Sequence, residues 1–337
     1  PRTRNTKNPP AVFQATDTSA HAADVTDVMT ALGYRRWLAY GVSYGTTIVL
    51  ELLRAEPPGL AGAVLDSVYP PDIDVDAAVA ESADSALVEL GAVCAADEAC
   101  RAINPDLVAS LSRLTERLDV EPVEVSLGPG ETVLDVPLEV VIDGEALSGQ
   151  VFRFLYSETR ARFVPGLLAG LEEGDPATAR WLARVAANLA VASLQSNDDG
   201  TYFAVQCADR LPFVTGHRSA ASDFAAAIAE PGLETLCEPW NREPSDHRVG
   251  TAVSSDLPVL IVGGRFDPIT PPAFARSVAE NLSAATVAIR DGRAHGVWAG
   301  DTCISSLVDD FMADPLRTLD LGCTEEQVAI DWRRPIG

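Results

Sequence analysis

The feature that most constrains this chain is the segment Gly41-Val42-Ser43-Tyr44-Gly45, a G-x-S-x-G pattern between two runs of different character. The apolar run 37–40 before it predicts a strand, and the run 46–53 after it has the pattern of a helix. A serine hydroxyl becomes a nucleophile when a sharp strand-to-helix turn presents it to a base, and flanking glycines relieve the steric conflict of that turn. The segment therefore predicts Ser43 as a nucleophile.

Two later strand-like runs each end close to a residue that such a nucleophile requires. Residues 257–264 form a continuous apolar run closed by two glycines, and Asp267 follows it. Residues 285–289 form a second run, and His295 follows that one. The carboxyl ends of parallel strands meet at one edge of an α/β sheet, so the order Ser43, Asp267, His295 predicts a catalytic triad on a mostly parallel sheet.

The chain has four candidates for the histidine of the triad: His21, His217, His247 and His295. His21 precedes the nucleophile on an expected helix over 18–32, and His217 and His247 fall in an expected insertion. In the predicted mechanism the remaining one, His295, is the general base and later the general acid. The backbone N–H of Tyr44 is the expected first donor to the oxyanion.

The residues before Ser43 contain neither the loop for a second oxyanion donor nor the early strands that an α/β sheet with this triad needs. A second oxyanion donor comes from a glycine-rich loop well ahead of the nucleophile, yet the 42 residues before Ser43 contain no such loop. Residues 1–16 are polar and contain proline, and 18–32 predict one helix with Thr18 or Ser19 as its N-cap. We therefore expect the N-terminal strands of the sheet to be missing from this chain, as in a fragment or processed piece, and to come from a separate N-terminal segment.

Composition fits a soluble globular enzyme and excludes other classes. The 337 residues and 47% hydrophobic content are ample for a packed core, whereas a formal charge of −24 argues against nucleic acid as a partner. The most apolar long run, 181–194, contains Arg184 and Asn188, so no membrane span is predicted.

The six cysteines leave more than one reading open. No Cys/His cluster has metal-ligand spacing, so neither a metal site nor a cofactor is expected. Their local placement suggests three disulfides, Cys94–Cys100, Cys207–Cys237 and Cys303–Cys323, which imply an oxidising, extracytoplasmic compartment. Buried free thiols are the alternative.

A large insertion separates the strand-like runs. Roughly 190 residues lie between the run 62–66 and the run at 258, too many for an ordinary crossover. They contain several helical patterns and a hairpin pattern around Gly128-Pro129-Gly130. We expect residues 1–72 and 253–337 to form the sheet-bearing core and residues 73–252 to form a mainly helical cap over Ser43.

These residues resemble a known family. The resemblance rests on the following stretches: Tyr40-Gly41-Val42-Ser43-Tyr44-Gly45-Thr46, Ala63-Val64-Leu65-Asp66-Ser67-Val68-Tyr69-Pro70-Pro71, Gly263-Gly264-Arg265-Phe266-Asp267-Pro268-Ile269-Thr270-Pro271, and Gly292-Arg293-Ala294-His295-Gly296 with Cys303 and Cys323. Together they resemble the secreted tripeptidyl and prolyl aminopeptidases of the α/β-hydrolase superfamily.

The resemblance implies an α/β-hydrolase fold and an exported serine exopeptidase that releases single residues or short peptides from free N-termini. Ser43, Asp267 and His295 match the family triad, but the family's His-Gly-Gly-Pro-Gly oxyanion loop is not in the sequence. The family also places acidic residues in the cap to hold the substrate ammonium group, and Asp209 is our candidate. Thr270 is read as an N-cap with Pro271 at the first helical position, or as a residue that tunes the acid loop.

Two alternatives remain open at this point. A carboxylesterase for small esters would keep the triad and need no ammonium anchor. A degenerate hydrolase fold used as a binding module would need none of the three catalytic groups in order.

Overall fold

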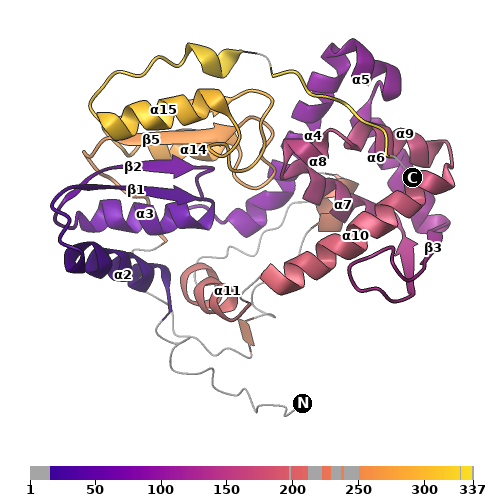
Figure 1. The fold of residues 1–337 in the computed structure, drawn as a ribbon, viewed down its shortest axis with the longest axis horizontal. Helices are drawn as coiled ribbons and strands as arrows, with labels where there is room; N and C mark the ends of the chain where they lie inside the picture. Colours follow the sequence, from indigo (N-terminus) through magenta and orange to yellow (C-terminus); the bar gives the residue numbers. More distant parts are fainter. Residues whose placement is uncertain are drawn as a thin grey trace.

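The computed structural model describes residues 16–196, 199–211, 222–228, 237–238, 250–326 and 328–335. A parallel four-stranded sheet lies in one part of it, in the order β1-β2-β5-β6 (Figure 1). The strands are β1 (Trp37–Val42), β2 (Leu60–Asp66), β5 (Val259–Gly264) and β6 (Ala285–Arg290). β2 and β5 lie at the centre and are almost wholly buried, which is why their sequences read as unbroken apolar runs.

Helices cover both faces of this sheet. Helices α3 (Tyr44–Ala55) and α14 (Pro272–Ala279) pack on one face with Ala63 and Leu65, and α2 (Thr18–Ala31) packs outside α3. Helix α15 (Thr302–Ala313) packs on the other face with Val64. The alternation along β2 is the period-two pattern of a strand buried on both sides, as a sheet covered by helices on both faces requires.

The helix expected over 18–32 is α2 and begins at Thr18 as predicted, but the expected N-cap, Thr18 or Ser19, was wrong. Asp17 is the N-cap, and its carboxylate accepts a hydrogen bond from the N–H of Ala20 at 2.8 Å. Thr18 turns inward instead, where its N–H and hydroxyl both donate to Asp209. A tertiary contact therefore decided which of several capping residues holds the helix end.

The insertion has its own hydrophobic core. Its elements are α4 (Val75–Ala96), α5 (Glu98–Ile103), α6 (Leu107–Val120), β3 (Val123–Leu127), β4 (Leu138–Ile142), α7 (Gly144–Leu155), α8 (Glu158–Ala161), α9 (Val164–Glu172), α10 (Pro176–Ser196), α11 (Asp199–Val205), the π-helix η1 (Gln206–Arg210) and α12 (Asp223–Ile228). β3 and β4 pair antiparallel, as the hairpin pattern predicted. Most of these elements lie to the right of the sheet in Figure 1. The core they share also takes in Phe266 and Ala294, which lie beside the predicted acid and histidine.

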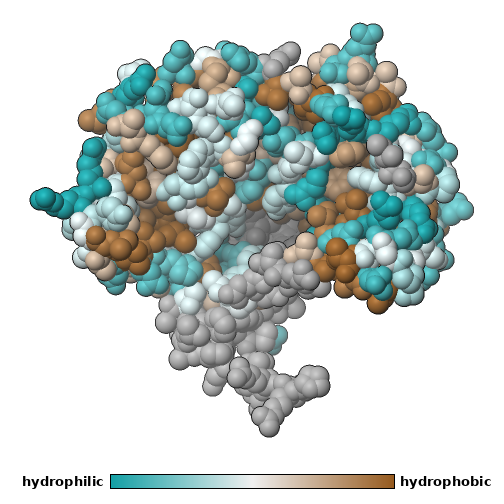
Figure 2. Space-filling model, in the orientation of Figure 1, coloured by the Kyte–Doolittle hydropathy of each residue, from teal (hydrophilic) through white to brown (hydrophobic). Residues whose placement is uncertain are grey.

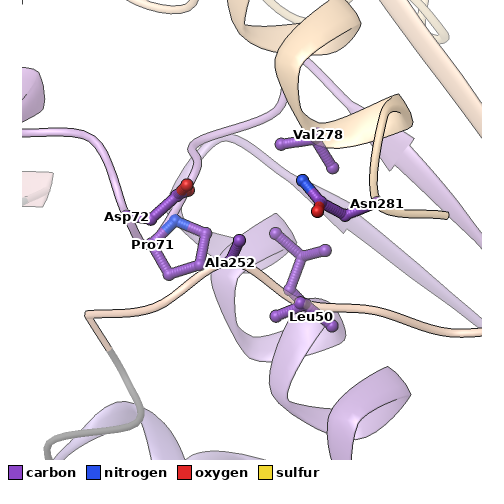
Figure 3. Close-up of a pocket in the computed structure, with 7 residues that line it drawn as sticks. Leu50, Pro71, Asp72, Ala252, Val278 and Asn281 are labelled. Carbon is purple, nitrogen blue, oxygen red and sulfur yellow. The ribbon is translucent and has the colours of Figure 1, made fainter.

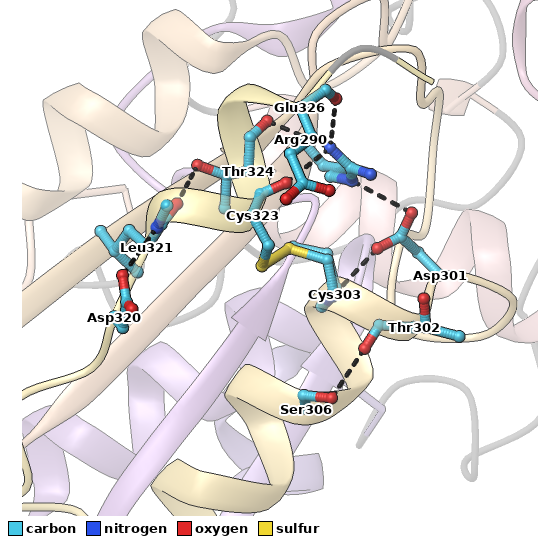
Figure 4. Close-up of a disulfide and its surroundings, with 12 residues drawn as sticks. Arg290, Asp301, Thr302, Cys303, Ser306, Asp320, Leu321, Cys323, Thr324 and Glu326 are labelled. Carbon is cyan, nitrogen blue, oxygen red and sulfur yellow. Dashed lines mark hydrogen bonds and ion pairs between the residues drawn. A yellow bond between two sulfur atoms is a disulfide. The ribbon is translucent and has the colours of Figure 1, made fainter. Parts of the chain in front are cut away.

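The three predicted disulfides are present: Cys94–Cys100, Cys207–Cys237 and Cys303–Cys323. The last joins the start of α15 to the 3-10 helix η4 (Gly322–Glu325). Beside it, the guanidinium group of Arg290 donates to Asp301 and to backbone carbonyls, including that of Cys323 (Figure 4). The segment after α15 is thereby held to the end of β6.

The outer side of β1 and the neighbouring helix α2 are covered by fewer described residues than the centre of the sheet. On that side β1 pairs with no strand within the described ranges. Figure 2 shows hydrophobic side chains over α2, where Val28 and Leu32 are 54% and 64% exposed. Among the residues that the structure describes, no helix combines the length and the apolar character needed to cross a membrane.

Candidate active site

Ser43 lies at a sharp turn between β1 and α3. Its backbone has φ 55° and ψ −127°, a conformation that non-glycine residues rarely adopt and that is typical of strained functional turns. A Cβ atom at Gly41 would lie 2.4 Å from the carbonyl oxygen of Gly45, so the turn requires glycine at 41. A Cβ at Gly45 would meet no atom within 4 Å, so the second glycine is not required on steric grounds.

The acid loop after β5 is built around Asp267. Its carboxylate is fully buried and accepts hydrogen bonds from the N–H groups of Ile269 and Thr270, both at 2.9 Å, and from the Thr270 hydroxyl at 2.7 Å. Thr270 is therefore not the N-cap of α14, a position that Pro271 occupies. Thr270 instead belongs to the acid loop, where its N–H and hydroxyl hold the carboxylate of Asp267.

Asp267 and His295 form a direct pair. The distance from Asp267 Oδ2 to His295 Nδ1 is 2.8 Å, and Thr270 Oγ1 lies 3.2 Å from the same nitrogen. Burial lowers the pKa of His295, but the charge of Asp267, its hydrogen bond and the charge of Asp66 together outweigh burial and leave that pKa raised. Burial raises the pKa of Asp267, but His295 and the Thr270 donors outweigh it and leave that pKa lowered.

Close backbone contacts bring the histidine loop to this position. A Cβ atom at Gly264 would lie 2.0 Å from the carbonyl oxygen of Ala294, so only glycine lets the loop pass over the end of β5. On its other side, a Cβ at Gly296 would lie 3.7 Å from Cγ2 of Val42. Val42 and Gly296 are the direct neighbours of Ser43 and His295, so the histidine loop lies against the nucleophile turn.

The insertion supplies an aromatic wall beside this pair. Tyr156, which follows α7, meets the His295 ring edge to face at 5.6 Å between centroids, and Phe152 meets Tyr156 at 5.3 Å. Arg293 links the same loop to the insertion through Glu158 at 2.9 Å. The sequence analysis did not single out Tyr156, since an aromatic residue at a helix end carries no signal of its partner.

Asp209 lies near the turn but is already engaged. It is 3% exposed, and its Oδ2 accepts from the N–H and the hydroxyl of Thr18 at 2.8 and 2.6 Å. The Thr18 hydroxyl lies 3.1 Å from the hydroxyl of Tyr44, which is also 3.2 Å from His21 Nδ1. Oδ1 of Asp209 is buried without a hydrogen-bond partner in the described structure.

Asp209 also lines a small pocket together with Thr18, Tyr44 and Arg210. Burial and the charges of Asp209 and Asp17 raise the pKa of Tyr44, and they outweigh the lowering effects of the Thr18 hydrogen bond and the Arg210 charge. Because Oδ1 of Asp209 has no partner, the pocket wall carries one acceptor that a bound donor can use.

A second pocket lies elsewhere and contains none of the predicted site residues. Leu50, Pro71, Asp72, Ala252, Val278 and Asn281 line it, between α3 and α14 (Figure 3). Within the described ranges, no group of three or more His, Cys, Asp or Glu side chains is arranged to hold a metal ion. His217 and His247, which the sequence analysis set aside, lie outside the described residues.

Comparison with known proteins adds a family to this geometry. Residues 222–321 match the family model described as TAP-like protein. This part of the chain is similar to TAP-like proteins. This TAP-like segment contains Asp267 and His295, whereas Ser43 lies ahead of it. No curated protein matches the chain.

Solved structures with a similar arrangement are distant in sequence. An α/β-hydrolase fold protein from Chitinophaga pinensis is 17% identical, with 89% of this chain and 73% of that chain covered and a TM-score of 0.35. A putative non-heme bromoperoxidase from Mycobacterium tuberculosis is 16% identical, with 89% and 75% covered and a TM-score of 0.37. An esterase from Exiguobacterium antarcticum is 13% identical, with 88% and 74% covered and a TM-score of 0.36.

Proposed function

We propose that this α/β-hydrolase is an exported serine aminopeptidase that releases single residues or short peptides from free N-termini through Ser43, Asp267 and His295. The observation that carries the proposal is the buried 2.8 Å contact between Asp267 and His295, in a loop that lies against the strained turn of Ser43. An acid that orients a histidine beside a serine on such a turn is the arrangement for nucleophilic acyl transfer.

The residues divide the reaction as follows. With Nδ1–H of His295 donated to Asp267, Nε2 takes the Ser43 proton as Oγ attacks the carbonyl carbon of the scissile bond. The carbon–nitrogen bond breaks, His295 returns the proton to the leaving amine, and an acyl-serine remains. Water, deprotonated by the same histidine, then hydrolyses the ester and restores the Ser43 hydroxyl.

One oxyanion donor comes from the turn itself. Tyr44 is the first residue of α3, so its N–H has no acceptor within the helix and is free to meet developing negative charge. We propose that the second donor, and a strand for the outer side of β1, come from a separate N-terminal segment. The support is the unpaired edge of β1 within the described ranges, since natural proteins cover such edges.

Asp209 is the proposed ammonium anchor. Its support is the unpartnered Oδ1, in a pocket that Tyr44 also lines next to the nucleophile. A buried carboxylate oxygen without a donor favours a cationic or N–H-bearing group in that pocket. Arg210 lines the same pocket, but its guanidinium contacts other groups: it lies over the Tyr69 ring at 3.9 Å and donates to the carbonyls of Pro70 and Ile73.

The three disulfides support the proposed export. Structural disulfides persist in extracytoplasmic compartments and are rare in a reducing cytosol.

The test compares matched chromogenic peptides with free and acetylated N-termini, together with a short-chain p-nitrophenyl ester and a Ser43→Ala control. An aminopeptidase cleaves the free-amine peptide at least about tenfold faster than the acetylated one, and Ser43→Ala abolishes this cleavage. Ester turnover without peptide cleavage would assign an esterase instead, and no turnover of either would reject the enzyme.

The anchor is tested with Asp209→Asn on the same substrate pair. We expect kcat/KM for the free-amine peptide to fall about 10- to 100-fold, which is the loss of one charge-assisted contact, and the acetylated peptide to change little. An equal fall for both peptides would show that Asp209 does not bind the substrate amine and has only a structural role, through its hydrogen bonds with Thr18.

A further inference from the structure

The dipeptide Asp66-Ser67 ends the central strand β2, between the strand that leads to Ser43 and the strand that leads to the acid loop (Figure 1). Both residues are only 1% exposed. Neither has a role in the proposed reaction, although both belong to a stretch that the sequence analysis singled out.

Their side chains bind the backbone directly after His295. The N–H of Gly296 donates to Ser67 Oγ at 2.9 Å, that of Val297 to Asp66 Oδ1 at 2.9 Å, and that of Trp298 to Asp66 Oδ2 at 3.0 Å. Three consecutive N–H groups of the histidine loop therefore end on two adjacent side chains from the centre of the sheet.

The main chain of the same two residues binds the neighbouring strands. The N–H of Ser43 donates to the carbonyl oxygen of Asp66 at 3.0 Å, and the N–H of Ser67 donates to the carbonyl of Val262 at 2.8 Å. One residue, Asp66, thus holds the nucleophile through its carbonyl and the histidine loop through its carboxylate.

The carboxylate is buried without a cation. Asp66 forms no salt bridge with any described residue, and its remaining donors are the hydroxyls of Tyr40 at 3.1 Å and Ser67 at 3.4 Å. Burial, followed by the charge and hydrogen bond of Asp66, raises the pKa of Tyr40, so its hydroxyl stays protonated and donates. A buried carboxylate that loses a hydrogen-bond donor costs more free energy than an exposed one, because no water replaces the donor. The carboxylate of Asp66 therefore holds its N–H and O–H donors in place.

Ser67 is held in an unfavourable backbone conformation, with φ at 55°. A serine persists at such a φ only when the surrounding structure holds it there. Glycine would fit this backbone more easily, but it would leave the N–H of Gly296 without its acceptor.

We propose that Asp66 and Ser67 are positioning residues that fix the His295 loop relative to Ser43. The inference rests on the proposed function for its kinetic consequence, but not for its structural one. Neither side chain touches the imidazole or the proposed ammonium anchor in any described contact, so both position the base through the backbone of residues 296–298. Asp66 also acts on the imidazole through its charge.

Ser67→Gly is the first test, because glycine suits the local backbone and the variant is expected to fold. Its matched control is Glu56→Gly, which places glycine at another positive φ, 45°, at the end of α3. We expect Ser67→Gly to lower kcat about tenfold with KM within about twofold, and Glu56→Gly to change neither. The melting temperature of each variant is measured alongside.

Asp66→Asn is the second test, matched by Asp106→Asn at the N-cap of α6. Asparagine presents an NH₂ group to one of the loop N–H donors at 66, whereas it remains a good N-cap at 106. We expect Asp66→Asn to lower kcat about 100-fold and Asp106→Asn to leave it unchanged.

A readout independent of turnover is the nuclear magnetic resonance spectrum of protein labelled with ¹⁵N-histidine. With four histidines in the chain, the His295 signals are assigned by their loss in His295→Gln. We expect Ser67→Gly and Asp66→Asn to shift or split these signals while both controls leave them in place. Because loss of the Asp66 charge alone can shift these signals, Ser67→Gly decides, and unchanged His295 signals in that variant would overturn the proposal. If the wild-type protein turns over no substrate, the proposed function fails and these signals alone decide the role of Asp66 and Ser67.

Discussion

The pKa of His295 sets the pH at which the proposed reaction begins. A general base must be neutral, and the Asp267 pair raises this pKa above the ordinary value of 6.5. We therefore expect kcat/KM to rise with pH through an apparent pKa above 6.5 and to fall as pH drops through it. A pH profile measured from pH 5 to 9 checks this, and an acid limb at or below 6.5 would contradict it.

The same pair predicts the effect of Asp267→Asn. This change removes two of the three contributions that raise the pKa of His295, the charge and the hydrogen bond of Asp267. Burial, which is the largest effect and lowers the pKa, is then opposed only by the charge of Asp66. We expect a histidine pKa below 6.5 by magnetic resonance titration and a fall in kcat of about three to four orders of magnitude. A conservative Asp310→Asn at a half-exposed position of α15 is the control and should alter neither quantity.

The two glycines beside Ser43 should respond differently to alanine. Gly41→Ala places Cβ 2.4 Å from a backbone oxygen, so we expect a loss of about 3 kcal/mol or more in the free energy of unfolding. Gly45→Ala places Cβ in open space at the start of a helix and should leave stability within about 1 kcal/mol. Urea denaturation of the pair measures the difference, and equal losses would show that the turn adapts.

At the scale of single residues, the sequence predicted three candidate catalytic residues, but not the direction in which side chains such as Thr270 point. The Ser43, Asp267 and His295 positions follow from a motif and from strand ends, and the structure brings Asp267 and His295 into contact. The main N-cap interpretation of Thr270 was wrong, because the hydroxyl turns toward Asp267. A sequence states that a hydroxyl is present but not which of two nearby acceptors it meets.

At the scale of elements, periodicity located the strands well because both faces of the sheet are buried. The runs at 257–264 and 285–289 became β5 and β6. Helix ends were less certain, because Asp17, Thr18 and Ser19 are all capping residues and the contact of Thr18 with Asp209 comes from 191 residues away. The local pattern predicts that a helix begins near residue 18, while the contact of Thr18 with Asp209 decides which residue is the N-cap.

The disulfides differ in the length of chain they close, so their removal should differ in effect. The Cys303–Cys323 loop spans 20 residues and the Cys94–Cys100 loop spans 6. Loop entropy predicts losses of about 3 and about 2 kcal/mol for the respective double serine variants. Urea denaturation without reductant compares them, and a larger loss for the shorter loop would mean that packing, rather than chain entropy, dominates.

Across the whole molecule, the contacts that place the insertion were beyond the reach of the sequence. Tyr156 meets His295, and the chain end reaches the insertion where Arg333 N–H donates to the carbonyl of Arg162 and Arg334 pairs with Glu173. Such contacts leave no period or motif along the chain. The division into a core of residues 1–72 and 253–337 and a cap of residues 73–252 remains a proposal.

The disulfide map has a consequence for how the molecule can be divided. Every cysteine pairs within 94–100, 207–237 or 303–323, so no covalent cross-link bridges the stretch between Cys237 and Cys303. A protease site inserted between the exposed residues Thr251 and Ala252 would yield two pieces that stay associated through the β2–β5 ladder in the folded protein. Denaturation would separate them without a reductant. One piece carries Ser43 and the other carries Asp267 and His295, so the molecule is a natural candidate for a split hydrolase whose activity reports the reunion of its halves.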